Sequence, residues 1–275
     1  MKPLKPAEIL ETSIEASIAK VESSFRRLLI LSVLAGAFIA FAAEGSNMAA
    51  FNLLANTDTY GLGKVLAGAV FGTGLIMVLL CGGELFTGNT LIAAAAVEKK
   101  VTVRKMLRNW FIVYCGNFLG ALLIAYLMNY SGLFASGGGM LGAVTIKIAV
   151  SKIGYSFGQA FVLGILCNWL VCLAVWLAYG ADTMAGKILG IFFPIWLFVT
   201  SGFEHSVANM YYIPAGILAK SNETFVSVSG LTEEVLAGLT WSDFLLGNLL
   251  PVTLGNLIGG SIFVAVAYLY AYKRA

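Results

Sequence analysis

The chain has 275 residues, of which 59% are hydrophobic and only 11% are charged, and its mean hydropathy is +0.89. A soluble domain carries about 25% charged residues, so this composition excludes a surface that faces water throughout and indicates an integral membrane protein. The net charge of +3 is too small to indicate a nucleic-acid partner.

Residues 1–27 are polar and are predicted to form an N-terminal amphipathic helix on the cytoplasmic side. Between Pro6 and Phe25, apolar residues recur at roughly helical spacing with glutamates and a lysine between them. This pattern predicts a helix that lies on the membrane surface or against the helical bundle. We favour an ordinary surface helix over one that gates a pathway.

Residues 28–275 are predicted to form a single all-α transmembrane domain. Crossing a bilayer takes about 20 apolar residues per helix, and six segments reach that length: 28–54, 65–97, 106–130, 155–179, 188–219 and 244–272. The second and fifth segments are too long and too interrupted for simple helices. We therefore expect both of them to be broken inside the membrane.

The distribution of basic residues predicts the orientation of the six segments. If both termini are cytoplasmic, all but four of the 17 lysines and arginines lie on the inside. The four exceptions are Lys64, Lys147, Lys152 and Lys220. Because cytoplasmic loops of membrane proteins are enriched in Lys and Arg, we expect cytoplasmic termini.

The chain contains two matched halves, at about residues 28–130 and 155–272. Residues 82–89 and 202–209 share the pattern G-x-E-x-x-x-x-N, and the following segments contain GNFLG at 116–120 and GNLIG at 255–259. Each half has three spans, an odd number, so the second half enters the membrane from the opposite side. Inverted repeats of this kind bring two broken helices together near the bilayer midplane.

The polar residues of the two motifs are predicted to support the helix breaks. An ionised side chain exposed to lipid is costly, so Glu84 and Glu204 are expected to accept hydrogen bonds from the backbone N–H groups freed at each break. Asn89 and Asn209 are expected to cap the helices that resume there. We assign these four residues structural roles.

His205 is the only histidine in the chain and directly follows the second break. An imidazole, with an ordinary pKa of about 6.5, changes charge near neutral pH, and ionisable groups inside a membrane are usually functional. A buried neutral imidazole bonded to a backbone carbonyl is the alternative. The four cysteines lack metal-ligand spacing, so we expect neither a metal site nor a cofactor.

At four stretches the chain resembles the formate/nitrite transporter family, which includes formate, nitrite and hydrosulfide channels. These stretches are residues 84–89 (ELFTGN), 164–176 (GILCNWLVCLAVW), 201–210 (SGFEHSVANM) and 251–260 (PVTLGNLIGG). The resemblance implies an aquaporin-like fold and a homopentamer in which each protomer has its own pore.

The resemblance also implies roles for individual residues. Thr87 and His205 correspond to the polar pair at the pore centre, and Lys152 and Asn168 to residues near the external mouth that draw and hold anions. The residues that correspond to apolar constrictions are Phe71, Leu75, Leu85, Phe86 and Phe198.

The implied function is a pH-dependent channel for small monovalent weak-acid anions in the cytoplasmic (inner) membrane, with formate favoured and nitrite or hydrosulfide as alternatives. An aquaporin-like neutral-solute pore is a rival, but it would carry Asn-Pro-Ala at both breaks, and neither break contains proline. An ammonium channel would need a histidine pair. A membrane enzyme would need a catalytic pairing that one histidine does not supply.

Overall fold

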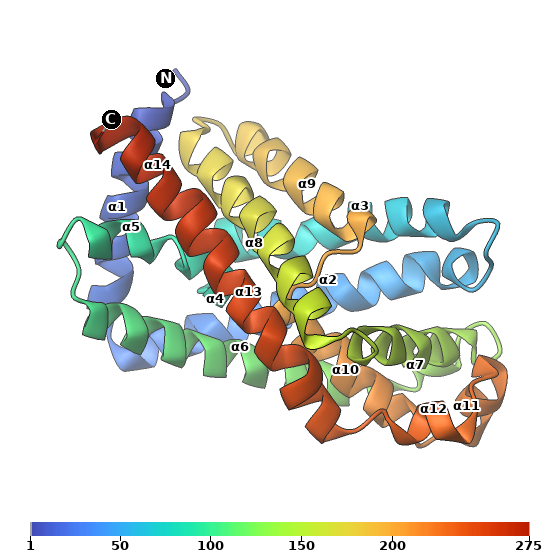
Figure 1. Ribbon diagram of the computed structural model, residues 1–275. Coiled ribbons are helices and arrows are strands. Elements are labelled where there is room, and N and C mark those ends of the chain that lie inside the picture. The colour runs from blue at the N-terminus through green and yellow to red at the C-terminus, as the bar shows by residue number, and fades with distance from the viewer. Residues whose placement is uncertain (1, 275) are drawn as a thin grey trace.

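The computed structural model describes residues 2–274, which form helices and no strands (Figure 1). Met1 and Ala275, the outer ends of the two predicted domains, lie outside the described residues. Six helices in this range are long and apolar enough to cross a membrane: Phe25–Leu54, Tyr60–Gly82, Val103–Ser131, Phe157–Gly180, Met184–Ser201 and Asp243–Lys273. The prediction of six spans is therefore confirmed.

The named elements follow the chain in order. They are α1 (Pro6–Glu22), α2 (Phe25–Leu54), α3 (Tyr60–Met77), α4 (Phe86–Asn89), α5 (Ile92–Val97), α6 (Val103–Ser131), α7 (Met140–Ile153), α8 (Phe157–Gly180), α9 (Met184–Ser201), α10 (Ser206–Ala219), α11 (Glu223–Ser229), α12 (Glu233–Ala237), α13 (Leu250–Gly260) and α14 (Ala267–Leu269). Short π-helical segments continue α3 and flank α13.

Both predicted helix breaks are present. The helix that starts with α3 ends at Gly82, and the chain is extended until α4 begins at Phe86. In the second half, α9 ends at Ser201 and α10 begins at Ser206. Gly82 and Gly202 have φ of 92° and 79°. This left-handed conformation is unfavourable for residues that carry a Cβ atom. Glycine at these positions therefore lets the chain leave each helix abruptly.

Two pairs of spans cross at backbone-to-backbone distance because glycines line the crossing. A Cβ on Gly120 of α6 would lie 2.0 Å from the carbonyl oxygen of Val33 on α2. A Cβ on Gly255 of α13 would lie 2.1 Å from the carbonyl oxygen of Phe161 on α8. The two glycine-asparagine motifs thus perform the same packing task in the two halves, as small residues do between membrane helices.

The N-terminal helix α1 packs against the bundle. Its buried residues include Ile9, Leu10, Ile14 and Val21, whereas Phe25 belongs to α2 and is exposed. At the same end of the molecule, Lys273 Nζ donates to Glu11 at 2.9 Å and lowers the pKa of that carboxyl. Both termini lie together there, opposite α11 and α12 (Figure 1).

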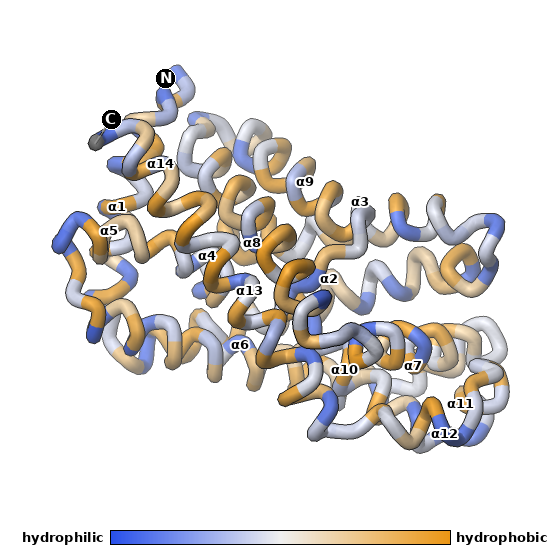
Figure 2. Tube along the Cα trace, viewed as in Figure 1, coloured by the Kyte–Doolittle hydropathy of each residue, from blue (hydrophilic) through white to orange (hydrophobic). Residues whose placement is uncertain are grey.

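Hydropathy agrees with the expected membrane placement of the long helices. Hydrophobic stretches follow the spans, and hydrophilic residues gather at the connecting turns and near the termini (Figure 2). The 14-residue helix α7, between the third and fourth spans, was not predicted from the sequence because it is too short to cross a bilayer. A run of three left-handed glycines, 137–139, directly precedes it.

We expect Gly120→Val to destabilise the fold by about 3 kcal/mol or more, because the new methyl groups would meet a backbone carbonyl that cannot move independently of α2. Gly61→Val is the matched control, since a Cβ there meets nothing within 4 Å. The measurement is the apparent Tm in detergent. A Gly120→Val variant that melts with the wild type would contradict the close crossing.

Candidate functional site

The two helix breaks meet at one pair of polar side chains. Thr87 lies in the first turn of α4, and His205 immediately precedes α10. Thr87 Oγ1 and His205 Nε2 are 2.8 Å apart, although 118 residues separate them in the chain. Both side chains are buried. The structure therefore brings together the two polar residues that the family resemblance implied as a pair.

The second hydrogen bond of His205 defines its tautomer. The backbone N–H of Ala208 donates to His205 Nδ1 at 3.1 Å, which makes the histidine the N-cap of α10. A nitrogen that accepts a hydrogen bond carries no proton, so the neutral ring carries its proton on Nε2. The Nε2–H group therefore donates to Thr87, and the Thr87 hydroxyl keeps its own hydrogen for another acceptor.

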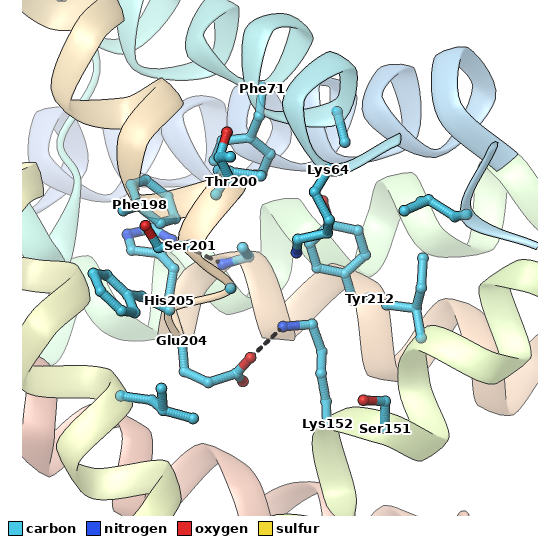
Figure 3. A pocket seen from close by; sticks show the side chains of 18 of the residues that line it. Lys64, Phe71, Ser151, Lys152, Phe198, Thr200, Ser201, Glu204, His205 and Tyr212 are labelled. Carbon is cyan, nitrogen blue, oxygen red and sulfur yellow. Dashed lines mark hydrogen bonds and ion pairs between the residues drawn. The ribbon is translucent and has the colours of Figure 1, made fainter. Parts of the chain in front are cut away.

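A cavity of about 640 Å³, here called the wide cavity, reaches His205 from one side. Phe71 and Phe198 line it, with their rings 5.7 Å apart and the Phe198 ring 6.0 Å from the imidazole. Lys64 and Lys152 extend into it from opposite walls (Figure 3).

A second space, a recess of about 20 Å³ here called the narrow recess, is lined by Leu75 and Leu85, and also by Gly88, the residue after Thr87. This volume is close to the minimum that holds one water molecule. Phe86 lines neither space and packs edge-on against Tyr114 at 4.9 Å. Four of the five residues predicted to form constrictions thus border one of the two spaces, and their role in a pathway stays a prediction.

Glu84 is held by a lysine and an asparagine. Lys20 Nζ on α1 donates to Glu84 at 2.8 Å, and Asn89 Nδ2 donates to the same oxygen at 2.7 Å. Asn89 also donates to Asn109 on α6 at 2.9 Å. The expectation that Glu84 accepts backbone N–H groups of its own break was wrong, because this partly exposed carboxylate accepts from the Lys20 ammonium and the Asn89 amide instead.

Glu204 has the same set of partners in the second half. Lys152 Nζ on α7 donates to it at 2.7 Å, and Asn209 Nδ2 donates at 2.7 Å. Asn209 also donates to Asn248 at 2.7 Å. Again the carboxylate binds a lysine and amides in place of the backbone of its break.

Two other asparagines bind the backbone of the breaks. The N–H of Phe86 donates to Asn117 Oδ1 at 2.8 Å, and the N–H of Ser206 donates to Asn256 Oδ1 at 2.9 Å. The prediction that Asn89 and Asn209 cap the resumed helices was therefore wrong. Both lie inside α4 and α10, where their amides face the glutamates.

Asn168 lies at the centre of the protein. It is fully buried on α8, and its Nδ2 donates to the carbonyl oxygens of Thr87 at 3.2 Å and Asn256 at 2.7 Å. The expectation that Asn168 lies near the mouth beside Lys152 was wrong, because its amide is needed where carbonyls freed by the first break face the second half. Lys152 itself lines the wide cavity, but Glu204 neutralises its charge.

The sequence reasoning missed Lys20, Asn109 and Asn248 as parts of these networks. A spacing signal was present, because Asn109 and Asn248 each precede the asparagine of a glycine-asparagine motif by eight residues. Lys20 on α1 and Lys152 on α7 hold the two glutamates in the same way, so these two helices have matching roles in the two networks. The opposite orientation of the two halves stays a prediction.

Six apolar spans and two helix breaks, each with a lysine–glutamate ion pair, define the class of a multi-pass membrane protein. Residues 7–270 match the family model described as Formate/nitrite transporter. The chain belongs to the formate/nitrite transporter family.

Several relatives match over nearly the whole chain. The uncharacterized transporter YrhG of Bacillus subtilis (strain 168) is 41% identical over 273 residues, which cover 98% of this chain and 94% of that protein. The formate channel BtFdhC of Bacillus thuringiensis is 41% identical over 273 residues, covering 98% and 96%. A solved structure described as a pentameric formate channel with formate bound has a TM-score of 0.83 at 37% identity, covering 90% of this chain and 97% of that one.

We expect Lys152→Met to destabilise the protein by about 3–5 kcal/mol, because it leaves Glu204 buried without its cation. The double variant Lys152→Met/Glu204→Gln should recover part of that loss. Lys147→Met, on the same helix but exposed, is the control and should change stability by about 0.5 kcal/mol or less. Apparent Tm in detergent is the measurement, and equal melting of Lys152→Met and Lys147→Met would refute the argument.

Proposed function

We propose that the protein is a channel that conducts formate across the cytoplasmic membrane, past the Thr87–His205 pair. The observation that carries this proposal is the 2.8 Å contact between the two side chains at the meeting point of the helix breaks, between the wide cavity and the narrow recess. The formate channels among its relatives support the choice of anion.

An anion that passes between Phe71, Phe198, Leu75 and Leu85 loses its water, which is costly without new hydrogen bonds. Thr87 and His205 supply them. The Thr87 hydroxyl has a free hydrogen, and Nε2–H can turn from Thr87 to the anion. A planar carboxylate with two acceptor oxygens fits two adjacent donors, so formate suits this site better than an anion with one acceptor atom.

The pH dependence of transport would come from the same histidine. Charging the ring places a proton on Nδ1, which must then release the backbone N–H of Ala208, because two donors cannot face each other. Acidification would therefore charge His205 and, at the same time, remove a hydrogen bond from the first turn of α10. An anion at Nε2 favours the charged ring, so occupancy and protonation support each other.

The protein would act as a homopentamer with five independent pathways and cytoplasmic termini. Support for assembly comes from the solved pentameric formate channel. Large side chains such as Phe111 and Leu246, exposed by 71% and 65%, remain available for lipid or neighbouring protomers. In this topology the wide cavity, with Lys64, Lys147 and Lys152, opens to the outside.

We expect His205→Phe to abolish formate flux or reduce it severely, because the phenyl ring of phenylalanine has no group that donates a hydrogen bond. His205→Asn should retain some flux with a much weaker dependence on pH. Thr87→Ala should be milder, since one neutral hydrogen bond contributes about 0.5–1.5 kcal/mol. Flux of labelled formate into proteoliposomes across a pH series is the measurement, with nitrite, hydrosulfide and water as competing solutes.

Two outcomes would overturn the proposal. A His205→Asn variant that keeps the wild-type pH profile would make the histidine structural. Wild-type vesicles that pass water but no small anion would favour the neutral-solute pore.

Mass measurement in detergent tests the assembly. We expect five copies of the 29.2 kDa chain, and cross-linking in native membranes should give a ladder that ends at the pentamer. A monomer or dimer that transports formate in vesicles would refute the pentameric arrangement.

A further inference from the structure

The cations of the wide cavity are not equivalent. Three lysines and one glutamate line it. Glu204 forms an ion pair with Lys152, whereas Lys64 and Lys147 have no carboxylate partner within residues 2–274. Lys147 is exposed, but Lys64 is only partly exposed, so its charge is less screened by water. Among the three lysines of the wide cavity, Lys64 is thus the one that is both partly buried and without a carboxylate partner in the described residues.

Two neutral side chains of the same cavity also have unused polar atoms. Asn47 Nδ2 on α2 and Thr200 Oγ1 on α9 are buried and have no hydrogen-bond partner in the described part of the chain. Both residues line the wide cavity, and Asn47 as a whole is only 2% exposed. A buried donor without a hydrogen-bond partner destabilises the protein, so an acceptor that enters from the cavity would be favoured beside these atoms.

Lys64 belongs to α3, and the helices that carry Asn47 and Thr200 both contact the stretch of α3 that follows it. Ser46, beside Asn47, donates from Oγ to the carbonyl oxygen of Ala67 at 2.9 Å. A Cβ on Gly68 would lie 2.8 Å from Thr200 Oγ1. Lys64 precedes Gly68 by four residues, which places it one helical turn away on the same face. Figure 3 shows Thr200 beside Phe71, and Lys64 further along the same wall.

We propose that Lys64, Asn47 and Thr200 form a binding subsite for a small monovalent oxoanion in the wide cavity, adjoining Phe71. This inference rests on the proposed function and identifies where the anion binds before it reaches Thr87 and His205. All three groups can donate hydrogen bonds, and Lys64 adds a full charge. An oxoanion of the size of formate has two oxygens, which together can accept hydrogen bonds from these three donors.

Lys64 supplies the attraction for an anion that Lys152 does not. Because Glu204 neutralises Lys152, that lysine contributes little net attraction for an anion in the cavity. Lys64 instead provides the uncompensated charge beside the apolar rings, where the anion first loses water. A charge-assisted hydrogen bond is stronger than a neutral one, so removing Lys64 should weaken binding more than removing either neutral donor.

The test uses the full-length protein in oriented proteoliposomes, with formate added on the side of the wide cavity. Lys64→Gln should raise the formate concentration at half-maximal flux by about tenfold, and Thr200→Val and Asn47→Leu by about two- to fivefold. Lys147→Gln removes the same charge from an exposed position of the same cavity, and its effect should be below about twofold. Equal effects of Lys64→Gln and Lys147→Gln would overturn the subsite in favour of a general charge effect.

Diffraction from crystals soaked in bromide gives a second readout that does not depend on formate flux. Anomalous scattering should show bromide between Lys64, Asn47 and Thr200 in the wild type and none there in Lys64→Gln. Wild-type protein that carries no formate but binds bromide at this place would refute the proposed function and keep the subsite. Formate flux without bromide at this place, and unchanged by Lys64→Gln, would refute the subsite alone.

Discussion

The structure depends on two carboxylates that lie at helix breaks within the membrane-spanning bundle. Backbone groups freed in a membrane helix must be satisfied by protein or water, and each break here recruits distant residues for that task. Asn117 and Asn256 bind the freed N–H and C=O groups. Glu84 and Glu204 then fix the geometry by pairing with lysines on α1 and α7. Both α1 and α7 are part of this support, because each supplies the lysine that pairs with the glutamate at a helix break.

These supports decide where chemistry is available. Since hydrogen bonds hold both breaks in place, the residues at the start of α4 and α10 face each other, and Thr87 contacts His205. Asn168 connects the two halves, because its amide donates hydrogen bonds to the carbonyl oxygens of both Thr87 and Asn256. The polar pair lies beside the Phe198 ring, and within the described residues no hydrogen bond joins it to a charged side chain, which suits the proposed anion site.

Much of this arrangement follows from local sequence. The length of the apolar segments predicted the six spans, and the repeated G-x-E-x-x-x-x-N pattern located both breaks. Glycine permits backbone conformations that end a helix, and a glutamate within an apolar segment needs polar partners. The partners of those glutamates could not be predicted the same way. Lys20 lies 64 residues from Glu84, and Asn168 lies 81 from Thr87, so only the packed helices reveal those pairings. The corrected roles of Asn89 and Asn209 arose from that limit.

Comparison of the two halves separates the residues that build the fold from those that act on a solute. The glutamates, their lysines and the three pairs of asparagines are the same in both halves. In the aligned motifs, however, Leu85 corresponds to His205 and Thr87 to Val207. Leu85 and His205 both precede a resumed helix, yet one closes the narrow recess and the other borders the wide cavity. A symmetric frame needs identical supports, whereas a pathway that discriminates between its two ends needs residues that differ. The substitutions that break the repeat are therefore where the proposed selectivity for an anion, and its proposed dependence on pH, should be sought.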